Sequence, residues 1–128
     1  MRVADFSGEC HVTNEIELES AISRRHGRGV NAFWLAHGDE KNPALAILVT
    51  GDLACLHYFP SDRHPGFRSV GAIEGLKRGE LTTFSVSSVS DEAGILNDAI
   101  VPYSVASTVA KEFFRSKELP RSIEWFEL

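Results

Sequence analysis

The sequence contains only two cysteines, Cys10 and Cys55, and no long apolar run. Small secreted proteins are held together by several closely spaced cysteine pairs, a pattern that two distant thiols do not provide. The longest apolar stretch, residues 44–49, is far shorter than the roughly 20 residues that cross a bilayer. The N-terminus also lacks the cationic and apolar segments of a secretory leader. We therefore expect free thiols, no membrane association and a place in the reducing cytoplasm.

Basic residues are also in short supply: 13 Lys and Arg stand against 18 Asp and Glu, which leaves a net charge of −5. Binding to nucleic acid depends on Lys and Arg that displace counterions from phosphates, so a negative chain is a poor candidate for it. A negative surface instead attracts a basic protein partner and speeds the encounter with it. We expect no direct contact with nucleic acid.

Sequence motifs for metals, nucleotides and nucleophiles are missing as well. Cys10 and His11 are neighbours that would point to opposite faces of a strand, and the other histidines are scattered, so the ligand spacing of a zinc site is lacking. Gly27 and Gly29 follow a predicted helix and precede a strand, the reverse of the order in a phosphate-binding loop. The G-x-S-x-G elbow and the deaminase signature of His-x-Glu with Pro-Cys-x-x-Cys do not occur. We expect no metal, no cofactor and no enzymatic activity.

One pair of residues keeps a catalytic alternative open. Cys55 and His57 are two positions apart on a predicted strand, so their side chains share a face. A thiol beside an imidazole is the arrangement of a cysteine nucleophile and its base. Two such residues in an apolar strand are also ordinary packing partners, and Cys55 is then a small core residue. A small enzyme built on this pair is the alternative to a non-catalytic protein.

Among the features that are present, a helix near the C-terminus is the clearest. Apolar residues recur at every fourth position in two adjacent rows, which predicts a helix with one buried face. Pro120 prevents this helix from continuing, and residues 122–126 then read as a short strand. The buried stripe consists of Val105, Ala106, Val109, Ala110, Phe113 and Phe114.

A second helix is expected near the N-terminus. Thr13 or Asn14 caps it, and its first turn is acidic, as the helix dipole favours. Arg24 and Arg25 close its last turn before the glycines that follow. This helix carries a narrower apolar stripe than the C-terminal one.

Strands fill the region between the helices. Residues 30–37, 44–50 and 53–59 read as strands, the last two joined by a tight turn. Residues 67–72 and 81–88 add shorter strands, the first at an edge, whereas residues 90–97 are polar and read as a loop. Short turns favour antiparallel pairing. The expected fold is one α+β domain, residues 1–128, with an antiparallel sheet of five to seven strands and two helices packed on it.

As a set, these residues resemble a family of bacterial immunity proteins from polymorphic toxin systems. The resemblance is carried by the C-terminal block EFFRSKELPRSIEWFEL, residues 112–128. In the family, an apolar helix is likewise followed by a basic turn, by R-P or L-P, and by a strand with E-W or T-W. Within the family, the chain is most similar to immunity proteins of double-stranded-DNA cytidine deaminase toxins. Supporting stretches are DFSGE at residues 5–9, SRR at 23–25, HYF at 57–59 and FRSVG at 67–71.

The resemblance implies a non-catalytic protein that binds the toxic domain of a cognate toxin in the cytoplasm and covers its active site. A toxin that handles nucleic acid has a basic groove, which an inhibitor of net charge −5 could fill with carboxylates. The alternative is a non-catalytic adaptor or scaffold that binds an unrelated protein, and the oligomeric state is left open. Candidate toxin-binding residues, on loops that a sheet would present, are Asp52, Asp62, Arg63, His64, Phe67, Glu74, Asp91 and Glu92.

Overall fold

The computed structural model describes residues 1–128. In chain order, its elements are β1 (Arg2–Asp5), β2 (Gly8–His11), α1 (Glu15–Ile22), β3 (Val30–Ala36), β4 (Ala44–Thr50), β5 (Leu53–Phe59), β6 (Phe67–Ser69), β7 (Leu81–Ser85), β8 (Glu92–Leu96), the 3-10 helix η1 (Asn97–Ala99), β9 (Ile100–Pro102), α2 (Tyr103–Ser116) and β10 (Trp125–Glu127).

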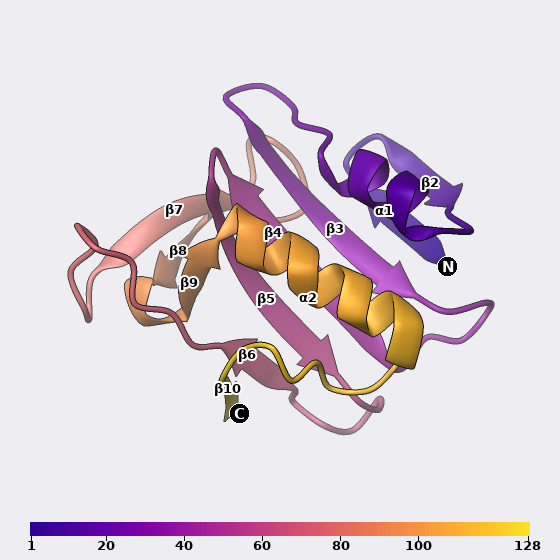
Figure 1. Cartoon of the computed structure of the whole chain (residues 1–128). Coiled ribbons are helices and arrows are strands. Elements are labelled where there is room, and N and C mark those ends of the chain that lie inside the picture. Colours follow the sequence, from indigo (N-terminus) through magenta and orange to yellow (C-terminus); the bar gives the residue numbers. More distant parts are fainter.

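Eight of these strands form one antiparallel sheet in the order β10-β6-β5-β4-β3-β1-β2, with β9 attached to β5. Both helices pack on the same face of this sheet, and Figure 1 views the molecule from that side. The strands β7 and β8 pair only with each other and form a separate hairpin. The predicted α+β class, with an antiparallel sheet and two helices packed on it, is confirmed. The separate hairpin was not predicted.

Two segments differ from the expectation. Residues 90–97, which read as a loop, contain β8, because this polar stretch pairs along its length with β7, from Leu81 opposite Leu96 to Ser85 opposite Glu92. Strand β6, expected at an edge, lies inside the sheet, because β10 pairs with its outer side. The outer partner of β6 is a distant segment of the chain, whereas the partner of β8 is the preceding strand; local composition reveals neither pairing.

The outer edge of β5 is shared between two segments, an arrangement that we call the β5 fork. The first residues of β5 pair with β9, and its later residues pair with β6. Between them, the buried hydroxyl of Ser69 accepts a hydrogen bond from the backbone N–H of Leu56 at 3.0 Å and donates one to the carbonyl of Ala99 at 2.6 Å. Buried backbone groups without partners are costly. One side chain therefore completes the hydrogen bonding where the two segments meet.

Helix α1 starts as predicted but ends earlier. The side-chain oxygen of Asn14 accepts a hydrogen bond from the backbone N–H of Glu17 at 2.9 Å, which caps the first turn. The helix ends at Ile22, so Arg24 and Arg25 lie beyond it. Their guanidinium groups reach back to carbonyls of the last turn, that of Arg25 to Ile22 at 2.9 Å. The arginines thus support the helix end from outside the helix.

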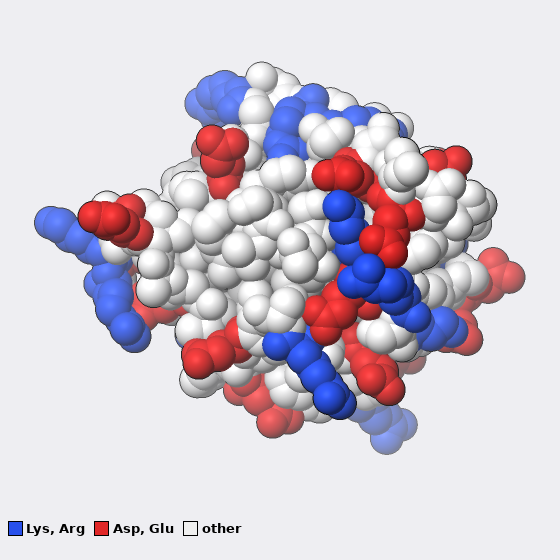
Figure 2. Space-filling model, in the orientation of Figure 1, with Lys and Arg blue, Asp and Glu red and all other residues white.

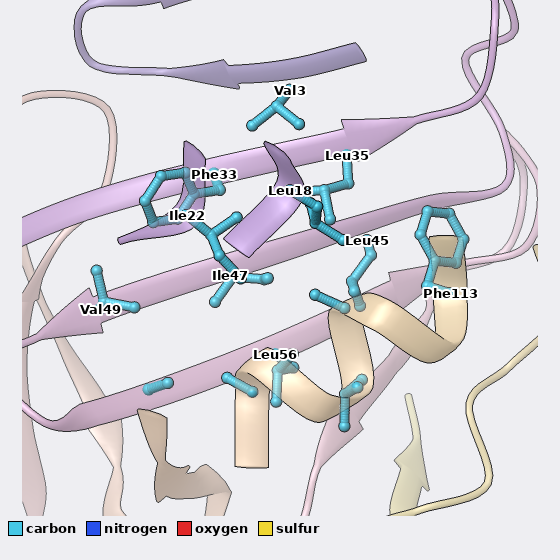
Figure 3. Close-up of a cluster of buried hydrophobic side chains, with 14 of the residues drawn as sticks. Val3, Leu18, Ile22, Phe33, Leu35, Leu45, Ile47, Val49, Leu56 and Phe113 are labelled. Carbon is cyan, nitrogen blue, oxygen red and sulfur yellow. The ribbon is translucent and has the colours of Figure 1, made fainter. Parts of the chain in front are cut away.

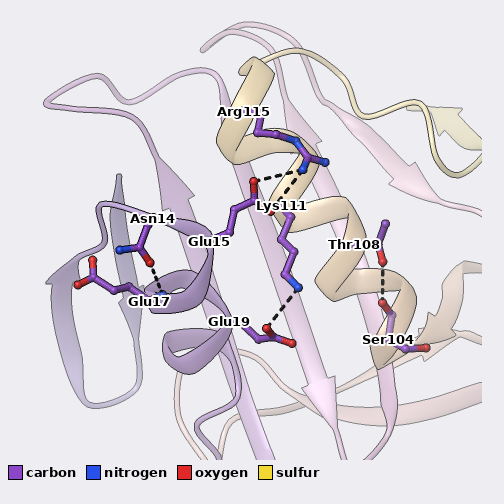
Figure 4. Close-up of polar contacts among 8 residues, drawn as sticks. All are labelled: Asn14, Glu15, Glu17, Glu19, Ser104, Thr108, Lys111 and Arg115. Carbon is purple, nitrogen blue, oxygen red and sulfur yellow. Dashed lines mark hydrogen bonds and ion pairs between the residues drawn. The ribbon is translucent and has the colours of Figure 1, made fainter.

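Two ion pairs join α1 to α2 on the solvent side (Figure 4). Arg115 lies 3.2 Å from Glu15, and Lys111 lies 3.3 Å from Glu19. Exposed pairs of this kind contribute less than about 1 kcal/mol each. They orient the helices, whereas the burial beneath them supplies most of the stability.

The hydrophobic core lies between the helices and the sheet (Figure 3). Four of the six predicted stripe positions of α2 are fully buried, and Val105 and Phe114 are partly buried at its margins. The helix ends at Ser116, and the capping residue Lys117, ahead of Pro120, has a left-handed backbone with φ of 63°. The fully buried positions of α2 are Ala106, Val109, Ala110 and Phe113. The sheet presents Phe33, Leu35, Leu45, Ile47, Val49 and Leu56 to the helices.

Neither α-helix could span a bilayer. Helix α1 has 8 residues and α2 has 14, and neither is apolar along its whole length. A membrane-crossing helix needs about 20 mostly apolar residues.

Candidate functional site

The face of the sheet opposite the helices carries a hollow. Strand β4 places Ala44 and Ala46 on this face, where Ala46 lies between Trp34 of β3 and His57 of β5, and Ala44 lies beside Phe59 of β5. Because side chains alternate along a strand, Leu45, Ile47 and Val49 of β4 face the core, whereas the two alanines and Leu48 face the opposite side. The hairpin β7–β8 packs over β3 and β4 but leaves an open space of about 410 Å³. We call this space the hairpin cleft.

Apolar side chains line the hairpin cleft almost completely. The sheet contributes Trp34, Ala46, Leu48, Cys55, His57, Phe59 and Arg68, and the hairpin contributes Leu81, Val86, Gly94, Ile95 and Leu96, with Ala99 below. A second hollow of about 330 Å³ shares Trp34, Ala46, Leu48 and Val86 with it and extends toward β1. The two hollows therefore adjoin each other on this face of the sheet, and each has a size usual for binding sites.

Three stacked rings cross the floor of the cleft. The ring of Trp34 stacks on that of Phe59 with centroids 5.3 Å apart, and the ring of His57 also stacks on that of Phe59, with centroids 5.1 Å apart. Trp34 comes from β3, whereas the other two rings come from β5. The alanines of β4 between them leave room for the rings to lean together. This rigid aromatic surface is positioned by strands and not by loops.

The polar groups of the cleft are few and incompletely satisfied. The Nε2 atom of His57 is buried and has no hydrogen-bond partner. Burial lowers the pKa of His57, and the nearby Arg68 guanidinium lowers it further, so the ring is neutral at pH 7. Arg68 donates to the carbonyls of Ser69 and Asp98 and stacks over Phe126 at 4.7 Å, but it takes part in no ion pair. The cleft thus holds one positive charge and no carboxylate.

The geometry of Cys55 bears on the catalytic alternative. Its thiol is buried, and burial raises the pKa of the Cys55 thiol to about 11. A nucleophilic cysteine needs the opposite shift, because only the thiolate attacks. The neutral His57 beside it makes no hydrogen bond that would hold a thiolate. The pair is accordingly part of the lining of the cleft.

Exposed large apolar residues gather around this cleft. The chain exposes seven of them, and Trp34, Leu81, Val86 and Leu96 all line the hairpin cleft. A fifth, Phe126, stacks on the cleft residue Arg68. Single exposed apolar residues are normal, but a cluster on one depression marks a contact surface.

The helix side carries a different hollow. Figure 2 shows a broad area without charged residues over the N-terminal half of α2, flanked by mixed charges over α1 and the C-terminal half of α2. A depression of about 880 Å³ lies beside this area, under the loop that follows β6. Its rim includes charged residues, among them Arg78 and Asp98, which form an ion pair of 3.3 Å. It is therefore wider and more polar than the hairpin cleft.

The residues predicted to form the contact surface fall in three places. Asp52 lies in the turn before β5, near the loop that carries Arg28, because the N–H of Gly51 donates to the carbonyl of Gly29. Glu92 lies 3.6 Å from Arg28, so it belongs to the same end of the sheet, and Asp91 precedes it. All three carboxylates are exposed. This end also holds the tip of the hairpin.

The second group lies after the other end of β5, about 20 Å away along a strand of seven residues. Asp62 accepts a hydrogen bond from Asn42, and Arg63 is exposed. His64 donates to Glu127 at 2.8 Å and stacks on Phe67 with centroids 5.0 Å apart.

Phe67 and Glu74 are the remaining two residues of the predicted contact surface. Phe67 is half-buried against Tyr58 at 6.3 Å, so its ring belongs mainly to the packing beneath the loop. Glu74 is exposed in the loop between β6 and β7, beside the helix-side hollow. The predicted residues therefore do not form one patch.

Sequence reasoning missed the hairpin cleft. Its residues were assigned to strands as ordinary packing positions, and β8 was not expected at all. One usable signal was present: Trp34, His57 and Phe59 share a face with the alanines of the strand between them. Large rings beside a row of small residues indicate a hollow in a sheet face. What covers that face is set by the tertiary position of the hairpin.

Comparison with known proteins gives one full-length match. No protein-family model matches the chain. The chain is 28% identical over all 128 residues to the double-stranded DNA deaminase immunity protein of Burkholderia cenocepacia (strain H111), and the match covers the whole of both proteins. The name is that of an immunity protein and not of an enzyme, as expected for this chain. The resemblance inferred from the sequence motifs is confirmed: this chain is similar from end to end to an immunity protein of a double-stranded-DNA deaminase.

Proposed function

We propose that this chain is an immunity protein that binds and neutralises a cognate toxin of the double-stranded-DNA deaminase type. The observation that carries the proposal is the end-to-end similarity to a double-stranded DNA deaminase immunity protein. A large aromatic and apolar depression, a buried thiol of raised pKa and a net charge of −5 all suit a protein that binds another protein. The chain acts in the cytoplasm of a bacterium that makes the toxin, within a polymorphic toxin system used in competition between bacteria.

Neutralisation consists of covering the toxin's active site, where a basic groove would otherwise receive DNA. Exposed carboxylates at both ends of β5 steer the basic toxin toward the inhibitor. The steering residues include Asp52, Asp91 and Glu92 around the hairpin tip and Asp62 at the opposite end. Arg63, His64, Phe67 and Glu74 complete the proposed contact set.

Co-expression tests the proposal directly. The chain is produced together with the toxin domain encoded beside its gene, and surviving cells and purified complex are measured. We expect survival and a stable one-to-one complex, whereas cells without the chain accumulate C-to-T mutations in their DNA. Cell death despite good expression of the folded chain would falsify the pairing.

The steering role of the carboxylates has its own test. Charge reversal at Asp62, Asp91 and Glu92 together should slow association with the toxin by about tenfold at low salt, with a smaller loss at high salt. A matched triple reversal at Asp39, Glu80 and Glu118 keeps the same net charge change at exposed positions outside the set. Equal association rates for both triples would assign the effect to net charge alone.

A further inference from the structure

We propose that the hairpin cleft is the docking centre for the toxin, and that it receives an apolar segment of the toxin that carries a carboxylate or carbonyl oxygen for Arg68. This inference rests on the proposed function and adds to it the surface and the chemistry of the toxin segment. Its centre lies among residues that belong to none of the predicted contact loops.

The exposed rim points to a protein as the occupant. Leu81 and Leu96 face each other across the hairpin and are 63% and 44% exposed. A pocket for a small ligand encloses most of the ligand surface, and its apolar residues point inward. Here the apolar residues continue outward onto the surface, as at the centre of a protein interface. Trp34, which is 43% exposed on the cleft floor, is of the residue type most often found at binding hot spots.

The charge of the cleft indicates which chemical groups the toxin segment would present to it. Arg68 is its only charged lining residue, and no carboxylate of this acidic chain pairs with it. Its guanidinium keeps unused donors, because its NH1 group alone bonds to backbone carbonyls. The buried Nε2 of His57 on the same floor also lacks a partner. A basic segment would be repelled by Arg68, whereas an oxygen acceptor satisfies it.

The helix-side hollow fits this role less well. Of the seven exposed large apolar residues, only Phe126 lines it. Of its charged lining residues, Arg78 and Asp98 pair with each other, and Arg68 borders this hollow as well as the hairpin cleft. The hairpin cleft is thus the depression where four exposed large apolar residues gather beside Arg68 and the unpartnered His57.

The first test uses the hairpin pair. A variant with Leu81→Ser and Leu96→Ser should bind the purified toxin domain at least about 30-fold more weakly, mainly through faster dissociation. Ile16→Ser is the matched control, because Ile16 is 82% exposed on α1, on the other side of the sheet. Both variants should keep the circular dichroism and thermal midpoint of the unchanged chain. Hydrogen exchange of the hairpin amides should slow in the complex.

The second test concerns the acceptor. Arg68→Gln removes the charge but keeps side-chain donors, and we expect about tenfold weaker binding. Arg68→Lys keeps the charge without the fork and should lose less. If Arg68→Gln binds as tightly as the unchanged chain while the hairpin variant is weak, the apolar docking stands and the acceptor is overturned.

The outcomes separate this inference from the proposed function. If the unchanged chain neither binds nor protects, the immunity proposal fails. If it binds and the hairpin variant binds equally well, the cleft is not the docking centre. If the hairpin variant binds the toxin normally but turns a dimer of the chain into a monomer in light scattering, the cleft is occupied by a second copy and the inference is overturned.

Discussion

The two faces of the central sheet are formed by the same strands, but one is covered completely and the other only in part. On the helix face, large side chains of β3, β4 and β5 meet two helices, and residues such as Leu45 and Phe113 have no exposed surface. On the opposite face, the alanines of β4 leave a hollow that a two-stranded hairpin covers only in part. The closed face holds the fold together. The open face keeps aromatic rings, a neutral histidine and an unpaired arginine within reach of a partner.

The comparison teaches where specificity can vary at little structural cost. Changes to the helix face act on packing that has no spare volume. Changes to Leu81 or Leu96 act on side chains that already reach water. Under the proposed function, a protein that has to match one toxin can thus vary the rim of the cleft while the packing on the helix face stays constant.

The largest expected effect is a loss of stability when a buried residue on the helix face is changed. Phe113→Ala should lower the free energy of unfolding by about 3–5 kcal/mol, because the ring is fully buried against Tyr58 and His37 and leaves a cavity. Phe126→Ala, at a ring that is 52% exposed on the other side, should cost less than about 1 kcal/mol. Urea denaturation of both variants measures the difference. Similar losses of unfolding free energy in both variants would show that the exposed ring of Phe126 also stabilises the fold.

A smaller effect on stability distinguishes two glycines, one packed against the backbone beside β9 and one in the hairpin that lines the cleft. A Cβ atom at Gly71 would lie 1.7 Å from the backbone oxygen of Ile100, so Gly71→Ala should cost about 3 kcal/mol. A Cβ atom at Gly94 would lie 2.8 Å from Cδ1 of Leu81, the tip of a movable side chain, so Gly94→Ala should cost less than about 1 kcal/mol.

The second glycine also probes binding. Because Gly94→Ala displaces Leu81 within the cleft, it should weaken toxin binding several-fold while the thermal midpoint changes little. Calorimetric unfolding and a binding titration on the same preparations check both parts. A large loss of stability with unchanged affinity would contradict this assignment of the two glycines.

How much of this the sequence reveals depends on the range of the interactions. Strands β3 to β5 and the cap at Asn14 follow from alternation and turn residues, so they were predicted to within about a residue. The stripe of α2 was visible for the same reason. The strand β8 was not predicted, because Glu92 and Gly94 are typical loop residues and only the pairing with β7 makes them part of a strand. The cleft depends on where that hairpin packs, which no local pattern contains.

The smallest expected effect is a pH dependence of stability. It comes from two histidines, one on each face of the sheet. Burial lowers the pKa of both His37 and His57 from the ordinary value of 6.5, and Lys117 and Arg68, respectively, lower it further. Folding therefore favours the neutral rings. Their contribution to stability is complete above pH 6.5 and is lost as the pH falls through the lower folded-state pKa values. Denaturation at pH 7.5 and 5.5 should show this decline, and His57→Gln should reduce it.

The same two histidines can show which face of the sheet the toxin contacts in the complex. Proton resonances of the imidazole rings, followed by NMR against pH, report each pKa separately. Toxin binding should change the titration of His57 in the cleft and leave that of His37 under α2 as it was. Equal changes in both would place the toxin elsewhere.

The β5 fork has a consequence for the order in which the fold assembles. The turns that join β3, β4 and β5 are short, so these strands can pair soon after collapse. The segments that meet at Ser69 are β6 and the residues before β9, and they are brought together only after a long loop has closed. We expect this junction to form late. Ser69→Ala should then speed unfolding in stopped-flow experiments and leave the folding rate almost unchanged, because its hydrogen bonds are absent from the transition state.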